Sequence, residues 1–345
     1  MTQLELLLPF AMPPAEMARD LLRELKMPSL AMLLARSSRS AHQVFDGFSR
    51  ALPHEYWLTR QFDSDNSPAL ATSAMRSFNL PAETGVWFIL QPVHLHISRD
   101  HLVLTDTRQL QLAESDARAL FDIVQPLFEE IGKTLVYGDA QTWFMRADDW
   151  HALRTSTSDA ACGHNIDIWM PKGPRERDWR RLQNEIQMHW HAHAINEQRE
   201  TRGLKPINSV WLSGGAEAEK TSEANTKFEE AFIFLNERNS FTALTKKQIP
   251  ITSSADIFDA KPQHGLLVLD NLIGPALAGD WSEWLMCFQS MEERWFAPLL
   301  QALQDGRLDK LAITISHNTV YSTFAISKSS LRKFWCKPAL ARLAS

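Results

Sequence analysis

Three polar stretches of the chain each follow an apolar run that predicts a buried strand, and they are the first candidates for a binding site. They are Ser213-Gly214-Gly215, Asn236-Glu237 and Asp270. The carboxyl ends of neighbouring parallel strands meet at one edge of an open α/β sheet, where ligands bind. We therefore expect these stretches to converge, with the backbone amides after Gly214 facing an anion. A plain turn is the alternative for an isolated glycine pair.

Further polar side chains lie before or near the end of the longest helical pattern in the chain, which runs from Pro174 to Gly203. Arg199, near the end of that pattern, is placed to supply a positive charge to an anion. Asn165 and Asp167 precede the pattern and are candidate ligand contacts, although turn and capping roles suit the same residue types. We expect Arg199→Ala to weaken the binding of a phosphate or carboxylate without unfolding the protein.

Two groups of histidines raise the question of a metal site. His94 and His96 alternate with apolar residues and would share one face of a strand. His189 and His193 are four residues apart and would share one face of a helix. Neither pair has a third ligand at a recognisable spacing. We therefore expect histidines that are hydrogen-bonded or exposed to solvent, and neither a metal nor another cofactor.

Several common catalytic motifs are missing from the sequence. It contains no GxGxxG, GxxxxGK[ST], GxSxG or HExxH pattern, so the usual dinucleotide, P-loop, hydrolase and metalloprotease motifs give no support for those activities. Its cysteines, Cys162, Cys287 and Cys336, are widely spaced and form no CxxC pair. Sparse, unpaired cysteines are typical of a reducing compartment, so we expect a cytoplasmic protein.

The first half of the chain predicts a strand, short helices and then an α+β unit. Residues 4–8 predict the first strand, and the short pieces that follow it have helical patterns. Period-two alternation over residues 86–98 and 101–112 predicts a β-hairpin. The expected divisions are a helical region with a first strand over residues 1–84 and an α+β hairpin-helix unit over residues 85–150.

The second half predicts an α/β region over residues 151–345. Apolar positions three and four residues apart predict one long helix from Pro174 to Gly203. Residues 166–170 alternate and predict a short strand before that helix. Apolar strands that alternate with helices predict a sheet covered by helices. The expected fold class is therefore α/β, a mixed sheet flanked by helices, with an α+β N-terminal and middle portion.

Charge and hydropathy exclude several classes of protein. The 345 residues carry a formal net charge of −5. This argues against a non-specific nucleic-acid binder, because such proteins present a basic field. No apolar run reaches the about 18 residues of a membrane-spanning helix. We expect neither a nucleic-acid partner nor a membrane partner.

Parts of the sequence resemble a known family. Residues 164–171 (HNIDIWMP), 179–215, 291–313 and the KFW at 333–335 are similar to the RpfE-type bacterial regulatory proteins. The QPVHLHISRDHLVL stretch also fits, and the resemblance spans residues 85–335. It implies a regulatory protein whose biochemical activity is not defined by the family.

That family is distantly similar to the archaeal-type cofactor-independent phosphoglycerate mutases of the alkaline phosphatase superfamily. The similar block contains Asn196, Arg199, Gly203, Asn208, Gly214 and Gly215. The resemblance implies an alkaline-phosphatase-like core and adds Asn196 and Asn208 to the candidate ligand contacts. Those mutases need an early Asp-Gly motif, a Ser or Thr nucleophile and a late Asp-His pair to hold two metal ions. The chain shows none of these motifs.

Together these features predict a regulatory or interaction protein with a degenerate mutase-like site. A small anionic ligand and a protein partner are its candidate binding partners. The first alternative is a metal-dependent phosphoryl-transfer enzyme whose ligands come from other positions, such as Asp167, His193 and Asp270. The second is a structural protein that binds a partner through tryptophan-rich helices.

Overall fold

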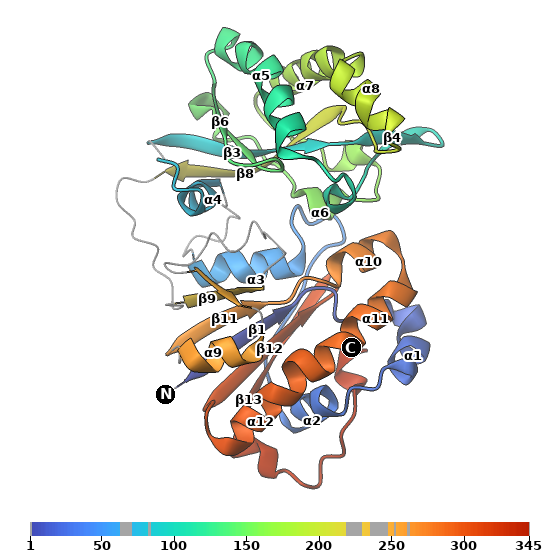
Figure 1. Cartoon of the computed structure of the whole chain (residues 1–345), viewed down its shortest axis with the longest axis vertical. Helices are drawn as coiled ribbons and strands as arrows, with labels where there is room; N and C mark the ends of the chain where they lie inside the picture. The colour runs from blue at the N-terminus through green and yellow to red at the C-terminus, as the bar shows by residue number, and fades with distance from the viewer. Residues whose placement is uncertain are drawn as a thin grey trace. The chain divides into compact units, whose positions relative to one another are not determined.

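The computed structural model describes residues 2–62, 71–81, 84–218, 230–234, 248–251, 253–260 and 263–344. The chain divides into two compact units. The first contains Met1–Gly47, Pro53–Ser64 and Ala224–Ser345, and the second contains Phe48–Leu52 and Asp65–Glu223. The expected divisions 1–84, 85–150 and 151–345 do not coincide with these units, because the first unit pairs strands from both ends of the chain (Figure 1).

Among the described residues, the first unit is built on a seven-stranded mixed sheet. In spatial order its strands are β10 (Gln248–Ile251), β9 (Glu230–Phe234), β11 (His264–Val268), β1 (Gln3–Leu8), β12 (Lys310–Ser316), β13 (Val320–Ser327) and β2 (Ser38–Val44). The first five strands are parallel, whereas β13 and β2 are added antiparallel. The mixed sheet that the sequence predicts is therefore present in this unit.

The central strand β1 follows from its composition. Leu6, Leu7 and Leu8 are fully buried, as expected for a parallel strand that is covered on both faces and therefore reads as a continuous apolar run. The predicted first strand is thus confirmed.

The prediction of helical pieces alone after residue 36 is wrong, because residues 38–44 form β2. This strand lies at the sheet edge and its side chains are mostly exposed, so it has no apolar alternation to reveal it.

Helices cover the sheet of the first unit. They are α1 (Ala15–Glu24), α2 (Pro28–Arg36), α3 (Pro53–Phe62), α9 (Ser254–Ala260), α10 (Ile273–Ala278), α11 (Trp281–Met291) and α12 (Ala297–Asp305). A π-helical turn joins α11 to α12. It carries the buried Glu292, whose carboxylate accepts hydrogen bonds from the backbone N–H groups of Ser29 (2.6 Å) and Leu30 (3.3 Å). Glu292 therefore satisfies the otherwise unpaired amides at the start of α2.

The second unit contains a four-stranded antiparallel sheet among its described residues. Its strands, in spatial order, are β6 (Thr134–Tyr137), β7 (Trp143–Arg146), β3 (Gly85–Val93) and β8 (Ser209–Ala218). A separate hairpin pairs β4 (Leu95–Ser98) with β5 (His101–Leu104). The predicted hairpin over residues 86–112 is thus formed only at its tip, because β3 pairs with β7 and β8 instead.

Helices lie on both faces of this antiparallel sheet (Figure 1). They are α4 (Ala71–Ser77), α5 (Glu114–Glu130), α6 (Ser158–Ala161), α7 (Glu176–His191) and α8 (Ala194–Thr201).

The single helix predicted from Pro174 to Gly203 is wrong, because it is broken between α7 and α8. The His193 ring accepts a hydrogen bond from the N–H of Ile195 and so caps α8 as a new helix.

The short strand predicted over residues 166–170 is also wrong. Ile166–Ile168 forms a 3-10 turn, and Ile168 is exposed. Apolar alternation over so few residues does not distinguish a strand from a turn that buries one side.

In the part of the chain that the structure describes, no helix has the length and apolar character to cross a bilayer.

Candidate functional site

The block from Asn196 to Asn208, to which the sequence assigns ligand contacts, forms a network of hydrogen bonds from side chains to the backbone. The Asn196 side chain is 3% exposed. Its Nδ2 donates to the carbonyls of Trp190 (2.9 Å) and Ile207 (2.8 Å), and its Oδ1 accepts from the N–H of Ile207 (2.8 Å). Both amide donors of Asn196 are therefore used within the fold.

Arg199 is fully buried in the same network. Its Nε donates to the Lys205 carbonyl at 3.0 Å, and its Nη2 donates to the Leu110 carbonyl. The Asp116 carboxylate lies 3.5 Å from Nη1. Burial lowers the pKa of Arg199, and the negative charge of Asp116 offsets only part of that lowering. The guanidinium is thus directed at backbone carbonyls and one carboxylate, and the expectation that Arg199→Ala would leave the fold intact does not fit this geometry.

Asn208 and His94 complete the network. The Asn208 side chain accepts from the N–H of Leu95 and donates to the Leu95 carbonyl, both at 2.8 Å. It therefore pairs with both backbone groups of Leu95, as the backbone of a neighbouring strand would. His94 Nδ1 donates to the Pro206 carbonyl at 2.8 Å. The carbonyls of Lys205, Pro206 and Ile207 therefore each accept a hydrogen bond from a side chain. The block fixes the connection that leads into β8 and the start of the β4–β5 hairpin.

The His94 and His96 rings form a stacked pair beside this network. Their centroids are 5.9 Å apart and their planes differ by 11°. Burial lowers the pKa of His94, and the positive charges of Lys205, His96 and Arg199 lower it further. Because Nδ1 holds its proton for the Pro206 carbonyl, the neutral ring has its lone pair on Nε2. A second proton would turn that nitrogen into a hydrogen-bond donor.

The other histidine pair does not share a helix. His189 lies on α7, whereas His193 caps the following helix. Taken by itself, neither compact unit brings three metal-ligating side chains close enough together to hold one ion, as far as the described residues go.

The glycine pair lies inside β8 and not at its end. Gly214 and Gly215 together lie opposite Phe88 alone, which is the arrangement of a β-bulge. Gly214 has a φ of 64°, a backbone conformation that glycine adopts without strain. A Cβ on Gly215 would lie 2.6 Å from the Phe88 ring. The pair is thus explained by the bulge and by close packing on Phe88.

Asn165 and Asp167 lie in the 3-10 turn before α7. The Asn165 side chain accepts a hydrogen bond from the Asp167 N–H at 3.0 Å, and Asp167 is exposed. This is the turn and capping role that the sequence left open as one of two possibilities.

The predicted meeting of three strand ends at one sheet edge is wrong for the glycine stretch, which lies in another sheet. Gly214 belongs to the antiparallel sheet of the second unit, whereas Asp270 follows β11 in the first unit. Asn236 and Glu237 lie outside the described residues. The prediction assumed that all three strands were parallel neighbours. This holds for β9 and β11, which pair in parallel, and it is wrong for β8, which pairs antiparallel with β3 in the other sheet.

The carboxyl edge of the parallel sheet nevertheless gathers residues from three adjacent strands. Asp270 follows β11, Phe10 follows β1 and His317 follows β12, and β1 lies between the other two. Phe10 is 3% exposed, and its ring centroid is 6.5 Å from that of His317. The Trp284 indole donates to the Phe10 carbonyl at 2.9 Å. Asp270 and His317 thus follow the strands on either side of an apolar strand end, and the buried His54 ring of α3 lies 5.8 Å from the Phe10 ring.

His317 was not singled out from the sequence, although a signal for it is present. Ser316-His317-Asn318 follows an apolar run as directly as the polar stretches that were chosen. Burial lowers the pKa of His317 below the usual histidine value, and the nearby Glu16 carboxylate offsets only part of that lowering.

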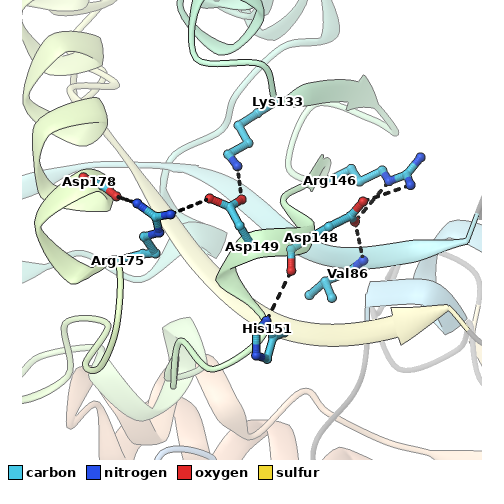
Figure 2. Close-up of polar contacts among 8 residues, drawn as sticks. All are labelled: Val86, Lys133, Arg146, Asp148, Asp149, His151, Arg175 and Asp178. Atoms are coloured by element: carbon cyan, nitrogen blue, oxygen red, sulfur yellow. Dashed lines mark hydrogen bonds and ion pairs between the residues drawn. The ribbon is translucent and has the colours of Figure 1, made fainter.

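A cluster of charged side chains surrounds the Asp148–Trp150 turn in the second unit (Figure 2). Asp148 accepts from Arg146 Nη2 at 3.0 Å and from the Val86 N–H at 2.8 Å. The hydrogen bond from Arg146 lowers the pKa of Asp148. The other members are Asp149, Asp178, Lys133 and Arg175. Three carboxylates balance three cations, so this cluster stabilises the turn without leaving excess charge for a ligand.

Comparison with known proteins bears on the fold only. Neither a protein-family model nor a curated protein matches the chain. The structure is similar to that of the PH0037 protein from Pyrococcus horikoshii, with a TM-score of 0.56 at 11% identity over 99% of this chain and 92% of that one. It also superposes on the cofactor-independent phosphoglycerate mutase from Thermoplasma acidophilum DSM 1728, with a TM-score of 0.44 at 13% identity over 100% and 94% of the chains. The likeness to PH0037 shows a shared fold, and the weaker superposition adds nothing to it.

Proposed function

We propose that the chain is a regulatory or interaction protein that binds its partners and performs no metal-dependent phosphoryl transfer. The observation that supports this most is the carboxyl end of β1, where Pro9, Phe10, Ala11 and Met12 are buried. Ligands of open α/β sheets bind at this edge. A two-metal phosphoryl-transfer site needs a set of carboxylate and imidazole ligands there, and apolar packing occupies the middle of it here.

An activity assay tests this proposal. The purified chain is incubated with Mg²⁺, Mn²⁺ or Zn²⁺ and assayed for p-nitrophenyl phosphate hydrolysis and for phosphoglycerate interconversion. We expect no turnover above the protein-free rate. Metal-dependent turnover that is lost in His317→Ala would overturn the proposal. Turnover lost in Asp167→Asn or Asp270→Asn would favour the enzyme alternative with its unfamiliar ligands.

A small anionic ligand is proposed to bind beside His94, His96 and Lys205. Arg199 contributes positive potential at His94 but keeps its own donors on backbone carbonyls. His96 and Lys205 are exposed, and His94 is half-buried. A bound anion would favour protonation of His94 at Nε2, because it offsets the surrounding positive charges.

The pH dependence of phosphate binding tests this site. We expect inorganic phosphate to bind more tightly at about pH 5.5 than at about pH 7.5, because His94 gains its second proton only below the usual histidine range. Titration calorimetry should show the affinity lost in Lys205→Ala and retained in Arg181→Ala, an exposed cation on α7. Binding that is independent of pH or unaffected by Lys205→Ala would contradict the assignment.

The finer assignments from sequence stay predictions. They are the relation to the RpfE-type regulatory proteins, the alkaline-phosphatase-like core, the protein partner and the cytoplasmic location. Affinity purification of the tagged chain from a bacterial host that encodes it would test the protein partner, and loss of the captured protein under a competing phosphate load would link it to the anion site.

A further inference from the structure

The charged side chains near the end of the given sequence are all cationic. Residues 310–345 contain no aspartate or glutamate, although the whole chain has 41 acidic side chains and a net charge of −5. The cations in this segment are Lys310, Lys328, Arg332, Lys333, Lys337 and Arg342. The segment itself is therefore basic, a local property that the net charge of the whole chain does not reveal.

Two adjacent aromatic side chains project from the same segment. Phe334 is 77% exposed and Trp335 is 78% exposed. Most large aromatic residues in this chain are buried, and the tryptophans at 143, 179, 190 and 284 have no exposed surface. A single exposed apolar side chain needs no explanation, but two neighbouring rings among cations form a distinct surface feature. We call residues 332–337 the basic aromatic loop.

The basic aromatic loop is held in a defined conformation. Leu331 before it is 7% exposed and Leu343 after it is fully buried, so both ends are anchored. Arg36 Nη1 donates to the Leu331 carbonyl at 2.7 Å, and the Arg36 guanidinium lies 5.9 Å from the centre of the Phe334 ring. Within the loop, the Cys336 N–H donates to the Lys333 carbonyl at 3.0 Å. The rings are thus presented by the fold and not by a free tail.

We propose that the basic aromatic loop docks on a membrane surface that contains anionic phospholipids. Aromatic rings favour the boundary between head groups and acyl chains, where one part of the ring system is apolar and another is wet. Lysine and arginine beside them would meet lipid phosphates while their aliphatic stems lie along the boundary.

The size of the feature favours lipid over a folded acidic protein. A stable protein interface buries about 800 Å² on each partner, which is more than a six-residue loop supplies. Insertion of two rings into a bilayer boundary needs no such area. The expectation of no membrane partner came from the lack of an apolar run long enough to span a bilayer, and a surface contact requires none. This proposal is independent of the proposed function.

Co-sedimentation with lipid vesicles tests the proposal on the full chain. Vesicles of phosphatidylcholine alone are compared with vesicles that also contain phosphatidylserine. We expect binding to the second kind only, weakened by added salt. The double variant Phe334→Ala/Trp335→Ala should bind at least about tenfold more weakly, because burial of one aromatic ring is worth that much. Lys333→Glu/Lys337→Glu should also lose binding.

Met188→Ala is the matched control, because Met188 is 78% exposed on α7 of the second unit, and it should bind as the unchanged chain does. Unchanged circular dichroism melting of every variant will confirm that the fold is intact. The proposal is overturned if the chain does not sediment with phosphatidylserine vesicles, or if the double aromatic variant sediments equally well. Capture of an acidic protein through Phe334 and Trp335, without vesicle binding, would also overturn it.

Discussion

The carboxyl edge of the parallel sheet and the block from Asn196 to Asn208 fail to offer an open catalytic site for opposite reasons. At the sheet edge the position suits a ligand, but the central strand ends in buried apolar residues around Phe10. In the block the residue types suit a ligand, but the side chains of Asn196 and Arg199 donate their hydrogen bonds to backbone carbonyls. A functional site needs both the position and polar groups that the fold leaves available.

The difference also shows how each region is stabilised. The sheet edge depends on apolar packing, so its residues tolerate loss of volume poorly. The block depends on hydrogen bonds in buried surroundings, so removal of one partner leaves others unsatisfied. Substitutions in the two regions should therefore both be destabilising, but by different mechanisms that separate experiments can distinguish.

The largest expected effect is at the sheet edge. Phe10→Ala should lower the free energy of unfolding by about 3–5 kcal/mol, because it leaves a cavity in a fully packed environment. Urea denaturation measures this value. Phe334→Ala in the same unit removes an exposed ring and should change stability by little. Similar losses in the two variants would show that the β1 end is not part of the core.

Arg199→Ala should be nearly as costly in the second unit. We expect a loss of about 3 kcal/mol, because it leaves buried carbonyls and a partly buried carboxylate without their donor. Arg202→Ala is the control, since Arg202 also contacts Asp116 (3.1 Å) but is 51% exposed. If Arg199→Ala leaves the denaturation curve unchanged while abolishing phosphate binding, Arg199 is a direct ligand contact and not a structural residue.

Gly215→Ala should have an intermediate effect. The added Cβ would approach the Phe88 ring to 2.6 Å, and the ring must shift to accept it. Overpacking of this kind costs about 1–3 kcal/mol. Gly47→Ala is a suitable control, because no atom lies within 4 Å of a Cβ at that position. Equal thermal stability of the two variants would argue against the bulge as the reason for the glycine pair.

The smallest effect is expected at the surface cluster around Asp148. Its pKa is lowered in the folded state, so its contribution to stability is present above the usual aspartate pKa and is lost as the pH falls through the folded value. Asp148 is 55% exposed, and the contribution should stay below about 1 kcal/mol. Asp148→Asn should therefore flatten the acid limb of a stability-versus-pH curve only slightly, as measured by urea denaturation between about pH 3 and pH 6. A large change would mean that the cluster holds the second unit together.

The sequence alone determined several features of this protein. The apolar run at residues 4–8 predicted the first strand, and helical periodicity predicted helix within residues 174–203, where α7 and α8 lie. These are local properties, since side-chain periodicity and residue type act within a few turns of the chain.

Tertiary structure alone decided the rest. Strand partners, and with them the failure of Gly214 and Asp270 to share a sheet, depend on contacts between residues remote in sequence. The burial of Arg199 and the exposure of Trp335 are likewise set by what packs around them, although both residue types suit either environment. The sequence shows the chemical type of a polar or aromatic side chain. Only the packing of the fold decides whether that side chain is accessible to another molecule.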